Sequence, residues 1–130
     1  MRQWLPAGGK PAKADIMERA FVYKLLTEEE WQAAESVGHA ASALDQADGY
    51  IHLSTRAQLA ETARRHFSGR GRIRLLEFDS AVLAPLRWEP SRGGDIFPHL
   101  YGPLEIGKAQ AGWWLEPDKD GAPGLPEDLQ

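Results

Sequence analysis

The amino-acid sequence predicts a single domain of the α+β class. Two segments carry the signals of helices, and about six short segments carry the signals of strands. Strand and helix alternate in the first half of the chain, whereas the second half contains only strands. A doubly wound parallel sheet needs that alternation throughout, so the mixture favours an α+β fold. The chain has 130 residues, of which 42% are hydrophobic, and this is enough for one buried core.

Both helices are predicted from the sequences that would cap them. Thr27 can cap a first helix, Glu30 can close its capping box, and Gly38 can end the helix. Thr55 can cap a second helix, with Gln58 three residues further on. An apolar stripe then follows at four-residue spacing, formed by Leu59, Ala63 and Phe67.

Apolar and alternating segments predict the strands. We predict strands at residues 20–26, 50–54, 73–79 and 86–89, an extended segment at 97–101, and a hairpin formed by residues 104–106 and 109–115. The strand at 20–26 is largely apolar, which indicates a central position in its sheet. Residues 39–47 are rich in Ala and Ser and are predicted to form a loop.

Composition divides the chain into three regions. Residues 1–19 are punctuated by Pro and Gly and are predicted to be a flexible N-terminal lead-in. Residues 20–116 are predicted to form the globular domain. Residues 117–130 are rich in Pro, Gly and acidic residues and are predicted to be a disordered acidic tail.

Charge and cysteine content narrow the classes of function. The chain has no Cys, which excludes disulfides and thiolate chemistry. It has no long apolar run and no recognisable signal peptide, so we expect a cytoplasmic protein without a membrane partner. The net charge of −4 disfavours a nucleic acid as a partner but does not exclude it. The arginines of residues 56–74 form either a solvated surface or a patch facing a phosphate.

A polar strand face is the first candidate for a site. Side chains alternate along a strand, so Tyr50, His52 and Ser54 share one face and the apolar residues between them share the other. This strand runs directly into a helix that begins near Arg56, and the free N–H groups of a helix N-terminus attract anions. The arrangement suits a phosphate or a ribose. The alternative is that His52 is structural and satisfied by a local partner.

A second strand repeats the pattern with Phe97, His99 and Tyr101 in register. An aromatic–histidine–aromatic face can stack on a flat ring and bind its rim through hydrogen bonds. The alternative is the interior of a sheet in which His99 is hydrogen-bonded. No metal is expected, because no spacing of His and acidic residues singles out a metal site.

Several segments of the chain resemble the "domain of unknown function 952" family of bacteria and plants. The segments are Gly49–Ser54, Leu75–Asp79, Leu86–Glu89 and Phe97–Leu104. The resemblance covers about residues 20–115 and is carried most specifically by the two histidine motifs.

That family is grouped, by remote fold similarity, with the ADP-ribosyltransferases and the RNA 2′-phosphotransferases. The resemblance implies a split core of two small antiparallel sheets that grips NAD. It implies that His52 binds a ribose, that Ser54 supports it, and that Tyr101 or Phe97 stacks on the nicotinamide ring. Members of those families also use a late glutamate.

The late glutamate is where the chain departs from the pattern. In those enzymes it stabilises the ribosyl cation or activates the acceptor. Glu105 and Glu89 are the candidates here, and neither lies in a recognisable motif. The identity of the carboxylate therefore stays open.

The leading hypothesis is an NAD- or nucleotide-binding domain that transfers ADP-ribose, or acts on a ribose phosphate, with an unknown acceptor. NAD would be its substrate. The catalytic candidates are His52, His99 and Glu105. The residues expected to bind the nucleotide are Ser54, Tyr50, Phe97, Tyr101 and Arg56.

Two alternatives stay open. The first is a phosphoesterase-like hydrolase in which one histidine is the base and the other is the acid. The second is a non-catalytic ligand-binding or interaction module in which both histidines are buried in hydrogen bonds.

Overall fold

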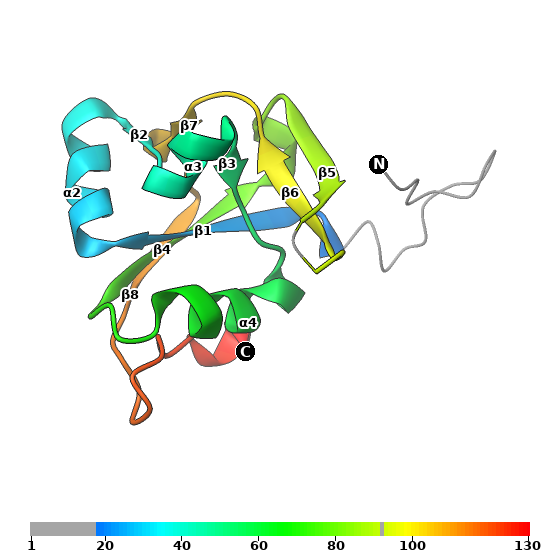
Figure 1. The fold of residues 1–130 in the computed structure, drawn as a ribbon. Coiled ribbons are helices and arrows are strands. Elements are labelled where there is room, and N and C mark those ends of the chain that lie inside the picture. The colour runs from blue at the N-terminus through cyan, green and yellow to red at the C-terminus, as the bar shows by residue number, and fades with distance from the viewer. Residues whose placement is uncertain (1–17, 92) are drawn as a thin grey trace.

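The computed structural model describes residues 18–91 and 93–130 (Figure 1). Almost all of the predicted flexible lead-in, residues 1–19, lies outside the described residues. The described part contains antiparallel sheets and three α-helices, and this confirms the α+β class. No helix in this part of the chain is long and apolar enough to cross a membrane.

The first sheet has three antiparallel strands, in the order β1 (Phe21–Thr27), β4 (Ile73–Asp79) and β8 (Ala111–Leu115). The central position predicted for residues 20–26 is wrong, because β4 is the central strand. The apolar character of β1 has another cause, because both of its faces are buried: Val22 and Leu26 belong to one apolar core and Leu25 to another. The edge of β1 also forms a bridge between Tyr23 and Ser54, with N–H···O distances of 2.8 and 3.0 Å.

The second three-stranded sheet is also antiparallel, in the order β3 (Ile51–His52), β6 (Ile96–Leu100) and β5 (Leu86–Pro90). A separate pair of strands joins β2 (His39–Ala40) to β7 (Leu104–Glu105). The predicted hairpin of residues 104–106 and 109–115 is therefore wrong. Between β7 and β8 the 3₁₀ turn η2 (Ile106–Lys108) carries the chain from one sheet to another.

Two of the helices were predicted, and both have the predicted capping boxes. These helices are α2 (Glu28–Val37), capped by Thr27, and α4 (Arg56–Phe67), capped by Thr55. The 3₁₀ turn η1 (Ser80–Val82) follows β4. Helix α3 (Ala43–Asp48) lies in the segment predicted to be a loop.

Helix α3 is short, but its ends are well defined. Ser42 and Asp45 form a capping box, and Gly49 ends the helix with φ of 83°. Residues with a Cβ rarely adopt such a φ, which explains the glycine. The next residue, Tyr50, directly precedes β3, so this turn determines where the first candidate site residue lies.

Two apolar cores lie on opposite sides of the first sheet. One includes Val22, Phe78 and Leu100 and packs between the two three-stranded sheets. The other packs β1 and β4 against α4 and includes Leu59 and Leu75. Figure 1 shows α4 and the C-terminal segment together on one side of this sheet.

The C-terminal segment differs from the disordered tail predicted for residues 117–130. Leu129, in the 3₁₀ turn η3 (Glu127–Leu129), is 4% exposed and belongs to the second core. Arg56 also donates a hydrogen bond to the backbone oxygen of Asp128. The composition is that of a disordered segment, but one buried leucine and its neighbour Leu125 attach it to the domain.

Candidate functional site

His52 and His99 face each other across two neighbouring strands. They are direct partners in the antiparallel ladder between β3 and β6, and their ring centroids lie 5.6 Å apart. Directly opposite residues in a ladder project on the same face of the sheet. The two histidine motifs of the sequence therefore form a single site.

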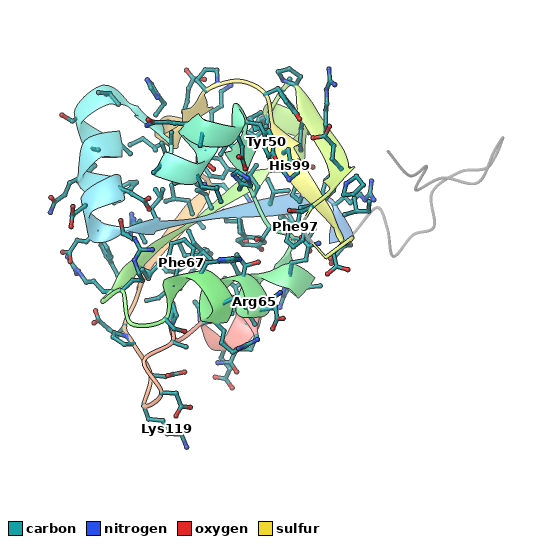
Figure 2. The ribbon with its side chains drawn as sticks, viewed as in Figure 1. Tyr50, Arg65, Phe67, Phe97, His99 and Lys119 are labelled. Atoms are coloured by element: carbon teal, nitrogen blue, oxygen red, sulfur yellow. The ribbon has the colours of Figure 1, made fainter. Side chains whose placement is uncertain are left out.

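Two tyrosines complete this group. The ring of Tyr50 stacks on His99 at a centroid distance of 4.2 Å and lies 4.7 Å from His52 and 5.3 Å from Tyr101. Figure 2 shows Tyr50 and His99 next to each other, between α3 and β6. Tyr50, His52, His99 and Tyr101 are referred to below as the His–Tyr cluster.

Two carboxylates from α3 bind the ring of His52. Its Nδ1 lies 2.6 Å from Asp45 Oδ1, and its Nε2 lies 2.9 Å from Asp48 Oδ2. Only the imidazolium form of histidine can donate from both ring nitrogens. The arrangement therefore suits a ring that acts as a hydrogen-bond donor.

Asp45 is itself paired with Lys24 of β1. Lys24 Nζ lies 2.7 Å from Asp45 Oδ2, and both residues are buried. Burial raises the pKa of the Asp45 carboxyl, but the hydrogen bond from His52 and the charge of Lys24 outweigh it, so the net pKa is lowered. Asp45 thus stays ionised although it is surrounded by protein.

His99 is in a different environment. Its Nδ1 lies 2.9 Å from Glu89 Oε1, an oxygen that also accepts a hydrogen bond of 2.7 Å from the Tyr101 hydroxyl. Burial lowers the pKa of His99, although Glu89 opposes this shift. The neutral ring is thus favoured. With Nδ1–H donated to Glu89, its Nε2 is an acceptor, and this atom is buried without a hydrogen-bond partner.

A shallow depression of about 260 Å³ lies beside the cluster. Two tyrosines, Tyr50 and Tyr101, line it, and Asp45 and Gln46 contribute from α3. The remaining lining residues are small or apolar: Ala41, Gly49, Ile51, Leu100 and Gly102. The depression is thus a shallow, mainly apolar space next to a polar cluster.

Three predicted site residues lie apart from the cluster. Ser54 is buried, and its hydroxyl donates to Thr62 Oγ1 rather than sharing a site with His52. Phe97 is half-buried farther along β6, away from Tyr50 (Figure 2). Arg56 is occupied by the backbone of Asp128.

Glu105 is also apart from the cluster. It lies on β7, where it pairs with His39 and forms an exposed ion pair of 3.0 Å with Lys108. The carboxylate that meets the predicted histidine is Glu89 of β5. Glu105 is therefore separate from the paired histidines, and Glu89 is the glutamate that contacts His99 and Tyr101.

The arginines of residues 56–74 do not gather into one phosphate patch. Arg64 and Arg65 pair with Glu61 on α4, whereas Arg72 pairs with Glu28 of α2. The guanidinium group of Arg72 also lies over the ring of Trp114, and that of Arg74 lies over the ring of Trp31. The exposed arginines of α4 agree with a solvated surface, whereas Arg72 and Arg74 are half-buried against tryptophan rings.

Sequence reasoning missed Lys24, Asp45 and Asp48. The spacing Ser42-x-x-Asp45 is a capping-box signal and could have revealed α3. Asp48 lies four residues before His52, so its proximity was also accessible. The contact between Lys24 and Asp45 joins β1 to α3 and carries no local signal in the sequence.

The fold and the site together define an α+β protein with paired histidines on an antiparallel ladder. The chain belongs to the family described as "Protein of unknown function (DUF952)", whose model matches residues 25–111. This membership confirms the family resemblance noted in the sequence.

Solved structures of protein CC0527 from Caulobacter crescentus are similar to this chain. The X-ray structure is 43% identical with a TM-score of 0.78, and the match covers 84% of this chain and 97% of that one. The solution NMR structure is 44% identical with a TM-score of 0.72, and covers 82% and 93%. A comparison with curated proteins gives no match.

Proposed function

We propose that this protein binds NAD, or a related nucleotide, through its ribose at the His–Tyr cluster, with a fold of the ADP-ribosyltransferase type. The observation that carries the proposal is the pairing of His52 with His99 beneath Tyr50. The family resemblance implies a histidine, an aromatic ring and a glutamate. Residues of all three types are in contact here, with Glu89 as the glutamate.

The hydrogen-bonding capacity of the cluster suits a ribose. His99 Nε2 is a buried acceptor without a partner, and a hydroxyl group is a donor that could satisfy it. Because Tyr50 covers the ring of His99 and Nε2 is buried, a ligand must displace Tyr50 to reach this atom. The apolar depression beside Tyr50 and Tyr101 would take a flat ring attached to the ribose.

A transfer reaction would use a carboxylate of the site, and the candidate is Glu89, which binds Nδ1 of His99. When the bond between the ribose and nicotinamide breaks, nicotinamide leaves with the electron pair and C1′ becomes cationic. The acceptor then supplies an electron pair to C1′ and loses its proton to water. The pKa of Glu89 is lowered, chiefly because hydrogen bonds from Tyr101 and His99 outweigh its partial burial, so an anion is available to stabilise the cation.

Calorimetric titration tests the binding step. We expect NAD and ADP-ribose to bind the wild-type protein, and His99→Ala and His52→Ala to weaken that binding by about tenfold or more. His66→Ala is the matched control, because His66 lies on α4, away from the cluster. The absence of binding of either ligand at millimolar concentration would overturn the proposal.

A two-histidine hydrolase is the second candidate, and the different partners of the two rings favour it. His52 is placed to donate from both nitrogens, whereas His99 has a free acceptor. Such a pair can act as acid and base on one phosphoester. A nucleoside cyclic phosphate should then be hydrolysed with a bell-shaped pH profile, and His52→Ala and His99→Ala should each remove one limb. No hydrolysis by the wild-type protein would exclude this candidate.

A further inference from the structure

We propose that Asp45 is a positioning residue that fixes the ring of His52 for ligand binding, and that Lys24 holds Asp45 in place. The proposal rests on the proposed function only in that His52 belongs to the ligand site. Neither residue was among the sequence candidates. Both act through His52 rather than on a ligand.

The contacts hold His52 by its backbone and its ring together. Asp45 Oδ1 accepts from the backbone N of His52 at 2.9 Å and lies 2.6 Å from its Nδ1. Lys24 Nζ donates to the backbone O of His52 at 3.0 Å. These three contacts fix the position of the residue and the rotation of its ring.

The second oxygen of Asp45 is also fully used. Asp45 Oδ2 accepts from Lys24 Nζ at 2.7 Å and from the backbone N of Ser42 at 2.9 Å. The carboxylate cannot rotate without breaking contacts on β1, α3 and β3 at once. Asp45 is therefore a rigid support rather than an adaptable one.

The energetics of a buried ion pair argue that this support has a purpose beyond stability. Lys24 is 4% exposed and Asp45 is 2% exposed. Removing both charges from water is costly, and well-packed apolar residues in such places are often at least as stabilising. An apolar pair could not accept a hydrogen bond from Nδ1 of His52. The ordering of His52 is what the ion pair adds.

This support also determines which nitrogen of His52 can work on a ligand. With Nδ1 bound to buried Asp45, Nε2 is the outer nitrogen, and its partner Asp48 has a side chain that is 35% exposed. A ligand could replace Asp48, whereas the Asp45 side chain is 0% exposed and both of its oxygens are already bonded within the protein. Asp45 is thus the permanent partner and Asp48 the exchangeable one.

A purely structural role for Asp45 makes a different prediction. Asp45 is also the third residue of α3 and closes its capping box with Ser42. If capping were its whole role, Ser42→Ala would affect His52 as much as Asp45→Asn does. If Asp45 positions the ring, Ser42→Ala leaves the carboxylate on His52 and only Asp45→Asn disturbs it.

NMR of the protein labelled with ¹⁵N-histidine separates these possibilities. A proton held between Nδ1 and a carboxylate at this distance is strongly deshielded, so we expect a downfield ring N–H signal in the wild type that His52→Gln removes. Asp45→Asn should lose this signal, whereas Ser42→Ala and Asp48→Asn should keep it. Absence of the signal in the wild type, or its loss in Ser42→Ala, would overturn the proposal.

The NMR result does not depend on a ligand, so it can be told apart from a failure of the proposed function. Where NAD or ADP-ribose binds, Asp45→Asn should weaken binding by about tenfold, and Ser42→Ala should not. If neither ligand binds the wild type, the proposed function fails, and the NMR signal still decides the role of Asp45. If Asp45→Asn does not fold, the presence of the downfield signal in the wild type and in Ser42→Ala still tests the proposal.

Discussion

The ring of Tyr50 covers the ring of His99, with an angle of 30° between their planes. Tyr50 follows directly on the glycine that ends α3, whereas His99 lies in the middle strand of the second sheet. Tyr50, which follows a turn, thus packs on His99, which is held in the β3–β6 ladder. The face of the His99 ring that contacts Tyr50 is therefore not open to a ligand.

Removing the ring of Tyr50 should expose His99 to reagents. We expect Tyr50→Ala to accelerate the modification of His99 by diethyl pyrocarbonate, measured by mass spectrometry of peptides, because His99 is only 2% exposed in the intact protein. His66, on α4, is the internal control, and its rate should not change. Equal rates for His99 in the two proteins would show that another group shields this ring.

The burial of His99 predicts a pH dependence of stability. Its pKa is lowered in the folded protein, so the unfolded chain takes up a proton first as the pH falls through its usual value of 6.5. The contribution of His99 to the free energy of unfolding is thus complete above about pH 6.5 and is lost as the pH falls through the folded pKa. Urea unfolding at pH 7.5 and 5.5 should show a smaller pH effect in His99→Gln than in the wild type. An equal effect in both proteins would contradict the lowered pKa.

Breaking the buried ion pair should be costly. Asp45→Ala leaves the ammonium of Lys24 buried without its partner, and we expect a loss of about 3–5 kcal/mol in the free energy of unfolding, measured with urea. Asp48→Ala removes a more exposed carboxylate from the same helix and should cost less than about 1 kcal/mol. Similar losses in the two variants would mean that the environment of Lys24 is wetter than its burial indicates.

The C-terminal attachment should also be measurable. Leu129→Ala should lower the free energy of unfolding by about 2–5 kcal/mol, because it removes a side chain buried in the second core. Asp128→Ala is the matched control, since the contact between this residue and Arg56 uses only the backbone oxygen. A loss below about 0.5 kcal/mol for Leu129→Ala would support the disordered tail that the composition suggested.

Local signals in the sequence were sufficient for some elements. The capping boxes at Thr27 and Thr55 predicted α2 and α4, because a cap needs only residues three apart. The alternation of side chains also placed Tyr50 with His52, and His99 with Tyr101. What brought these two groups together is the register between β3 and β6, which no local pattern specifies.

Other predictions failed because long-range contacts decided them. Ser54 was expected on the face of His52, but β3 ends at His52 and the chain then crosses to form a bridge with Tyr23. Glu89 could be separated from Glu105 only once β5 was known to pair with β6. Leu129 is buried because α4 and β4 form a surface for it, although its own neighbours in sequence are polar.

Hydrogen–deuterium exchange at the bridge between Tyr23 and Ser54 can measure how tightly the two three-stranded sheets are held together. The two amides of this bridge connect β1, in the first sheet, to the segment that follows β3, in the second. Their exchange rates therefore report how often the sheet that carries the His–Tyr cluster separates from the sheet behind it. Rates as slow as those of the β1–β4 amides would mean that the two sheets open only when the whole protein unfolds.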